Sequence, residues 1–140
     1  EIASCLVGSE MCIRDSPSRG RNAEIPPLTR SAVQFFNRLL LPDMRLADHW
    51  HISVLLAPDV AGVAPALVVL ADRDILHDEG LQYAERLRTA GVEVTQRTCV
   101  GMIHGFITMG GVIRAAEETI ELAALMLRQR LLPVQPRFAA

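Results

Sequence analysis

The pattern of hydrophobic and polar positions changes its period along the chain, and each change marks an expected element. Residues 66–71 (ALVVLA) form a short continuous apolar run, which is typical of a strand buried on both faces of a parallel sheet. Residues 92–97 alternate apolar and polar side chains, which predicts a second, partly covered strand. Elsewhere apolar residues recur every three or four positions, which is the period of an amphipathic helix.

Segments with the helical period predict three helices, over residues 30–40, 78–90 and 112–130. Thr29 is a suitable N-cap for the first helix, and Pro42 stops it. Gly91 suits the left-handed position that commonly follows a helix. The third helix is expected to bury a stripe formed by Ile113, Ala116, Ile120, Ala123 and Leu127. Loops are expected over residues 17–28, 43–65, 72–77 and 99–111.

The resulting order of elements is helix, strand, helix, strand, helix, which favours an α/β fold with a mainly parallel sheet and helices on both faces. A length of 140 residues corresponds to one domain or part of one. Two strands cannot form such a sheet by themselves. We therefore expect the chain to be an incomplete part of a larger domain.

The first sixteen residues are interpreted separately from the rest. Their sequence, EIASCLVGSEMCIRDS, contains a stretch that resembles translated sequencing-adaptor read-through, and it has no amphipathic period. Residues 1–16 are therefore expected to be a non-native artefact, and residues 17–140 to be the partial α/β domain.

Composition narrows the classes of partner and compartment. The chain has 14 basic and 16 acidic residues and a net charge of -2, with no basic stretch that would follow phosphates, so nucleic acid is not an expected partner. No apolar run reaches the roughly 20 residues of a membrane-spanning helix. The odd number of cysteines (Cys5, Cys12 and Cys99) favours a reducing compartment and a cytoplasmic location.

Candidate chemistry lies where the two expected strands end. Asp72 and Asp74 follow the first strand, and His104 follows the second. In open parallel sheets, active residues gather at the carboxyl ends of the strands. An acid followed by a histidine is the second half of the order Ser, acid, His found in α/β hydrolases. In such a triad the carboxylate orients the imidazole, which accepts the proton of the serine hydroxyl.

Two motifs carry a resemblance to a known family. The segments Asp74–Gly80 (DILHDEG) and Gly101–Phe106 (GMIHGF), with YAERLRTAG between them, resemble the hormone-sensitive-lipase-like carboxylesterases, the α/β-hydrolase fold-3 family. The resemblance covers residues from about 18 to 130. It implies an α/β-hydrolase fold of which this chain is the C-terminal part.

The resemblance also implies roles for individual residues. It assigns the catalytic acid to Asp74 and the catalytic histidine to His104. Substrate binding falls on Phe106, near the pocket, and on Phe35 and Phe36, in a segment similar to the wall of the acyl pocket.

The chain departs from the family pattern in several places. Ile75 stands where the family usually has Pro, and His77 stands where it usually has Arg. No Gly-x-Ser-x-Gly motif and no His-Gly-Gly-Gly segment occurs, so the nucleophile and the oxyanion hole are absent from this chain. Because the members of a triad act as a unit, the chain alone is expected to be inactive.

Other interpretations of these residues stay open at this point. Asp72 competes with Asp74 for the role of the acid, and Asp78 and Glu79 are expected to serve the start of their helix as cap and dipole partners.

The resemblance implies that the intact protein hydrolyses short-chain carboxylic esters without a cofactor or metal, and that it could form a homodimer. His49 and His51 are too weak a pattern to predict a metal site. The alternatives are another α/β hydrolase, of the dienelactone hydrolase or oligopeptidase type, and a non-catalytic hydrolase-fold protein that binds a small molecule.

Overall fold

The computed structural model describes residues 16–131, which fall into two compact units that meet between His104 and Gly105. All of the segment expected to be an artefact, apart from Ser16, lies outside the described residues. The first unit contains α1 (Pro17–Arg21), α2 (Arg30–Leu40), η1 (Met44–Asp48), η2 (Val54–Leu56), β1 (Ala66–Arg73), α3 (His77–Thr89) and β2 (Val94–Ile103). The second unit contains η3 (Phe106–Thr108) and α4 (Arg114–Leu131).

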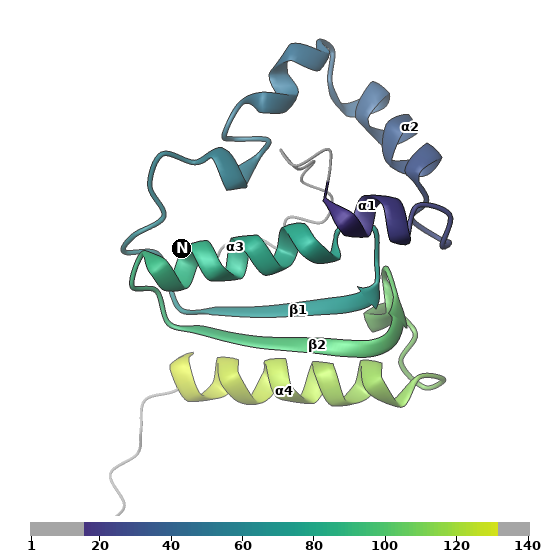
Figure 1. Ribbon diagram of the computed structural model, residues 1–140. Helices are drawn as coiled ribbons and strands as arrows, with labels where there is room; N and C mark the ends of the chain where they lie inside the picture. Colours follow the sequence, from purple (N-terminus) through teal and green to yellow (C-terminus); the bar gives the residue numbers. More distant parts are fainter. Residues whose placement is uncertain (1–15, 132–140) are drawn as a thin grey trace, which may run out of the picture. The chain divides into compact units, whose positions relative to one another are not determined.

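Strands β1 and β2 form a two-stranded parallel sheet in the first unit, as expected. Parallel neighbours need a crossover connection, and α3 supplies it. Figure 1 shows α3 lying along one face of the two strands, with α1 beside the end of β1 at which α3 begins. The carboxyl ends of both strands therefore meet at one edge of the sheet.

A small apolar core joins α3 to the segment that precedes β1. The cluster contains Ala57, Val60, Leu87 and Val92. The guanidinium group of Arg86 donates hydrogen bonds to the backbone carbonyls of Leu55 and Ala57. The long connection before β1 is thus fixed by backbone contacts to α3, although it contains only two short 3-10 turns of its own.

The helix expected over residues 30–40 forms as α2, and the hydroxyl of Thr29 accepts a hydrogen bond from the backbone N–H of Ala32 at 3.2 Å. The loop expected over residues 17–28 is wrong in its first part, because residues 17–21 form α1. Pro17 lies in its first turn, where a fixed φ and a missing N–H cost nothing. A helix this short is marginal alone, so tertiary contacts decide it.

The second strand is also longer than its alternating pattern predicts. Strand β2 continues to Ile103, whereas a loop is expected from residue 99. In this extra length, Cys99 and Ile103 pair with Ala71 and Arg73 of β1, and the sequence pattern does not contain that information. Strand β1 is expected to be buried on both faces, but only Leu70 and Ala71 are buried. Residues 66–69 are half-buried, because β2 is their one strand neighbour among the described residues.

A change of register interrupts the sheet near its carboxyl edge. Ala71 pairs with Cys99, but Arg73 pairs with Ile103, so β2 contains two more residues than β1 over this interval. Gly101 lies within the extra residues and has a φ of +78°, a left-handed conformation that favours glycine. The pairing of Arg73 with Ile103 aligns the last residues of the two strands.

In the second unit, the helix expected over residues 112–130 forms as α4, but its buried face differs from the expected stripe. Ala116 and Thr119 are fully buried, whereas Ile120 and Leu127 are 48% and 53% exposed. Apolar residues surround much of this helix, so periodicity alone does not locate the buried face. No helix among the described residues is long and apolar enough to cross a bilayer.

We expect Gly101→Ala to lower the free energy of unfolding by about 1–2 kcal/mol, because an L-residue is strained in the left-handed conformation. A Cβ atom at Gly101 would meet no heavy atom within 4 Å, so steric overlap is not the cause. Urea unfolding measures the change. Gly20→Ala is the matched control, because it also has open space but lies in a helix without a positive φ. Equal stabilities of the two variants would contradict the account of the bulge.

Candidate active site

Asp74 and His104 meet at the carboxyl edge of the sheet. The Nδ1 atom of His104 lies 2.7 Å from the Oδ2 atom of Asp74, although the two residues are 30 positions apart. Asp74 directly follows β1 and His104 directly follows β2. The expected juxtaposition of an acid and a histidine at strand ends is therefore present in the structure.

The register of the strands explains why these two residues become neighbours. The residue numbers of paired residues in β1 and β2 differ by 28 at Ala66 and Val94, and by 30 at Arg73 and Ile103. Since Asp74 and His104 follow the second pair, the same offset of 30 brings them side by side. Without the two additional residues in β2, the continued pairing would place Met102 opposite Asp74.

The carboxylate of Asp74 is held by two donors. Its Oδ1 atom accepts the backbone N–H of Leu76 at 2.9 Å, which leaves Oδ2 for the imidazole. The side chain is mostly buried, with 13% of its surface exposed. This turn of the backbone fixes the carboxylate by a local contact, so the direction of Oδ2 does not depend on the histidine alone.

The hydrogen bond to Asp74 determines the chemistry of His104. This bond raises the pKa of His104 above its ordinary value of 6.5, although partial burial opposes the shift. An ionised carboxylate only accepts, so Nδ1 carries the hydrogen and Nε2 of the neutral ring is the nitrogen that accepts a proton. The ring keeps 30% of its surface exposed, so it is accessible to a reacting group.

Asp72, the competing acid, does not take this position. Its Oδ1 atom is buried without a hydrogen-bond partner among the described residues, and no hydrogen bond joins its carboxylate to His104 in that part of the chain. The geometry therefore favours Asp74 as the partner of the histidine.

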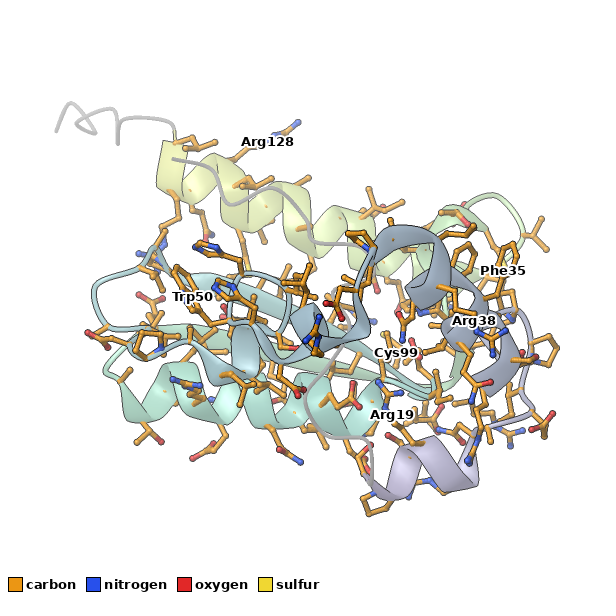
Figure 2. All side chains as sticks on the ribbon, turned by 90° about the horizontal axis from the view of Figure 1, so that it is seen from above. Arg19, Phe35, Arg38, Trp50, Cys99 and Arg128 are labelled. Atoms are coloured by element: carbon orange, nitrogen blue, oxygen red, sulfur yellow. The ribbon has the colours of Figure 1, made fainter. Side chains whose placement is uncertain are left out.

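The residues expected to bind substrate have different environments. Phe35 (Figure 2) lies on α2 with 57% of its surface exposed. Phe36, next to it, is 48% exposed, and the two rings pack edge to face at 5.7 Å. Phe106 is buried, with 4% of its surface exposed, but it belongs to the second unit. Within the first unit the structure brings Asp74 and His104 together and leaves an apolar surface on α2.

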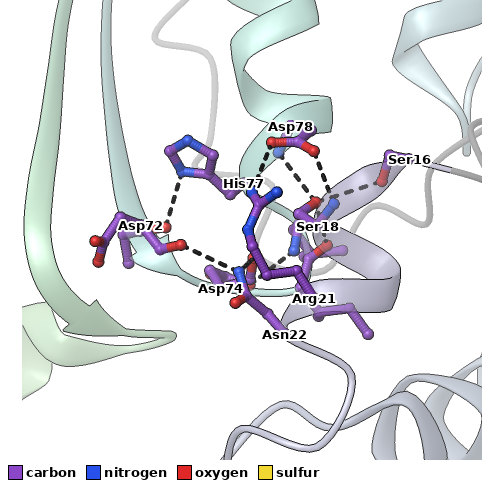
Figure 3. A network of polar contacts seen from close by, with 11 residues as sticks. Ser16, Ser18, Arg21, Asn22, Asp72, Asp74, His77 and Asp78 are labelled. Atoms are coloured by element: carbon purple, nitrogen blue, oxygen red, sulfur yellow. Dashed lines mark hydrogen bonds and ion pairs between the residues drawn. The ribbon is translucent and has the colours of Figure 1, made fainter.

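Contacts of the loop that carries Asp74 extend to α1, which the sequence analysis did not include in the site. Figure 3 shows the amide of Asn22 reaching the backbone of Asp72 and Asp74, and Ser18 reaching the start of α3. The hydroxyl of Ser18 accepts the N–H of Asp78 at 3.2 Å and donates to the carbonyl of Ile75 at 2.9 Å. No local sequence signal identifies these contacts, because they join residues fifty or more positions apart.

The acidic pair at the start of α3 binds α1 as well as serving the helix dipole. One carboxylate oxygen of Asp78 accepts the backbone N–H of Ser18 at 2.7 Å. Glu79 is 1% exposed and forms an ion pair with Arg19. The expectation that Asp78 caps α3 is wrong. The hydroxyl of Ser18, which belongs to another segment, accepts the N–H of Asp78 at this end of the helix.

The centroids of the His49 and His51 rings lie 4.9 Å apart. Trp50, labelled in Figure 2, lies between them in sequence. Among residues 16–131 no group of three or more His, Cys, Asp or Glu side chains is arranged to hold a metal ion.

Comparison with known proteins places the fold in a defined class. Residues 5–108 match the family described as alpha/beta hydrolase fold, and the chain belongs to this family. The match covers most of the first unit, including both Asp74 and His104. The sequence-based expectation of a partial α/β-hydrolase fold is thus confirmed.

Individual relatives are ester hydrolases. Carboxylesterase NlhH of Mycobacterium tuberculosis is 34% identical over 118 residues, which are 82% of this chain and 37% of that protein. Hormone-sensitive lipase of Homo sapiens is 34% identical over 83 residues, or 58% of this chain and 8% of that protein. The structure of the carboxylesterase EstE1, cloned from a metagenomic library, superposes with a TM-score of 0.80 at 34% identity, covering 84% of this chain and 40% of that one.

These relatives confirm the resemblance to the hormone-sensitive-lipase-like carboxylesterases. The chain spans about two fifths or less of the length of the relatives that it matches.

We expect Asp74→Asn to lower the pKa of His104, because the hydrogen bond to the carboxylate is the largest cause of its upward shift. Burial, which lowers the pKa of His104, then acts without the opposing hydrogen bond to a carboxylate. Titration of the imidazole signals by NMR measures the change, with Asp59→Asn at an exposed site as the control. An unchanged titration of His104 in the Asp74 variant would show that the contact does not form in solution.

Proposed function

We propose that the protein containing this chain is a serine carboxylesterase in which His104 is the general base and acid and Asp74 orients it. The observation that supports this most directly is the 2.7 Å hydrogen bond between the two side chains at the carboxyl ends of adjacent parallel strands. This edge is where α/β folds of this kind carry their active residues. The relatives, which are carboxylic ester hydrolases, support the same reaction class.

The proposed reaction begins with a serine outside this chain. Nε2 of His104 accepts the proton of the serine hydroxyl as the serine oxygen attacks the ester carbonyl. The imidazolium is stabilised by Asp74, and it then donates its proton to the departing alcohol as the acyl-enzyme forms. A water molecule, deprotonated by the same imidazole, hydrolyses the acyl-enzyme. The carboxylic acid leaves and the serine regains its proton.

The substrate is proposed to be a short-chain carboxylic ester. Phe35 and Phe36 offer a half-exposed apolar surface of the kind that an acyl chain requires. A role of Phe106 in substrate binding, which the resemblance implies, is a separate proposal. The reaction as written needs no cofactor or metal, because proton transfer and nucleophilic attack use only side chains and water. A cytoplasmic location and a homodimer are further proposals for the whole protein.

In the complete protein, we expect His104→Ala to lower kcat/KM for p-nitrophenyl butyrate by at least about 1000-fold, because the serine loses its base. His77→Ala is a matched control. Among the described residues, the hydrogen bond of its ring is to the backbone carbonyl of Ala71, at 3.0 Å. A His104 variant with full activity would refute the assignment.

For residues 17–140 alone, we expect no turnover of p-nitrophenyl butyrate above the buffer rate, because the acid and the histidine have no nucleophile to activate.

In the complete protein, the same assay with a dienelactone and a peptide substrate distinguishes a carboxylesterase from other α/β hydrolases. If the complete protein binds esters but hydrolyses none of these substrates, the non-catalytic alternative is favoured.

A further inference from the structure

The amide of Asn22 bridges two carbonyl groups of the loop that carries the acid. Its Nδ2 atom donates to the backbone oxygen of Asp74 at 2.8 Å and to that of Asp72 at 3.1 Å. Carbonyl oxygens only accept, so both hydrogens of the amide group are used. Asn22 is 3% exposed, and a buried bond of this kind is costly to lose.

The position of Asn22 is itself fixed by α1. Asn22 follows the last residue of this helix, and its N–H donates to the carbonyl of Ser18 at 2.9 Å. Ser18 contacts Ile75 and Asp78 through its hydroxyl and backbone N–H. The amide therefore projects from a segment that is already bound to both sides of the acid loop.

These contacts leave the carboxylate of Asp74 little freedom. The carbonyl of Asp74 is held by Asn22 and by the N–H of His77, the latter at 3.2 Å. With the backbone fixed on both sides, the N–H of Leu76 can bind Oδ1 and direct Oδ2 towards the histidine. Loss of the amide would remove one donor from each of the two carbonyls, leave the carbonyl of Asp74 with the weaker contact to the N–H of His77, and allow the turn to move.

We infer that Asn22 is a positioning residue, which holds the backbone of Asp74 so that its carboxylate meets His104 at hydrogen-bonding distance. This inference rests on the proposed function, because it assigns Asn22 to the support of the catalytic acid. Asn22 acts through Asp74 and touches neither His104 nor the substrate.

The charged and titratable groups around this loop come from the end of β1, from α3 and from α1. Apart from the pair Asp74 and His104, these groups are Arg19, Arg21, Asp72, Arg73, His77, Asp78 and Glu79. Arg19 pairs with Glu79, and Arg21 pairs with Asp78 at 3.3 Å. A substitution of Asn22 changes none of these groups, so a change in the titration of His104 reports its contact with Asp74.

The test uses the complete protein and the variants Asn22→Ala and Asn22→Leu, the second of which keeps the branched shape of the side chain without a donor. Glu24→Ala is the matched control, because Glu24 is an exposed residue two positions away. The rate of p-nitrophenyl butyrate hydrolysis is measured from pH 5 to 9 and normalised to the folded fraction from circular dichroism.

We expect both Asn22 variants to lose roughly 10- to 100-fold in kcat with little change in KM, as for a small misplacement of a catalytic group. The acid limb of kcat/KM should also move to lower pH, because His104 loses part of the bond that raises its pKa. The Glu24 variant should show neither change.

A loss of activity without a shift of the acid limb of the pH profile would mean that Asn22 has a merely structural role. Unchanged activity would mean that Asn22 has no role in the reaction. Each outcome overturns the inference. Failure of both variants to fold would do the same, because it would assign Asn22 to the fold and not to the acid. If the unmodified protein hydrolyses no ester, the proposed function fails. NMR titration of His104 in the Asn22 variants then still decides the positioning role.

Discussion

The parallel pairing of β1 and β2, with its change of register, is the constraint on which the rest of the site depends. Two strands joined by a helix bring residues about thirty positions apart to the same edge of a sheet. The pairing alone, however, would leave Asp74 opposite the wrong residue. The two additional residues of β2 around Gly101 correct this offset, so a local backbone irregularity determines which side chain the acid meets. Bulges near active sites commonly direct a side chain in this way.

The acid is supported from two directions, and the two kinds of contact have different consequences. Local bonds within the turn hold the carboxylate, whereas contacts from α1 hold the backbone of the turn. The buried pair of Arg19 and Glu79 joins α1 to α3, and a buried pair is a weak source of net stability because desolvation offsets the attraction. Its geometric effect is to join α1 to the start of α3, beside the acid loop. The arrangement therefore favours a defined position of the acid over maximum stability.

The sequence predicts the elements whose signals are local, and it fails where distant contacts decide. Thr29 and the apolar run of β1 are local signals, and both structures form as expected. Helix α1 is too short to form from propensity, and it exists because Ser18 and Arg19 bind α3. The extension of β2 and the bulge depend on a partner strand. The pairing of Asp74 with His104 is predictable from the order of the elements, but the role of Asn22 is not, since an asparagine in a loop has no long-range signature.

In the proposed mechanism the catalytic groups are divided: the acid and the histidine belong to this segment, and the serine belongs to another part of the protein. The acid and the histidine are bound to each other and to one sheet edge within the first unit, so their geometry is set by contacts that this segment supplies itself. The imidazole is held in one tautomer before any substrate or nucleophile is present. Such preorganisation avoids an entropic cost during the reaction, because only the serine and the ester remain to be placed. In the proposed mechanism the oxyanion donors and the serine must then be positioned against this histidine. Hydrogen bonds that hold the backbone around Asp74 therefore serve the reaction although they do not touch the reacting atoms.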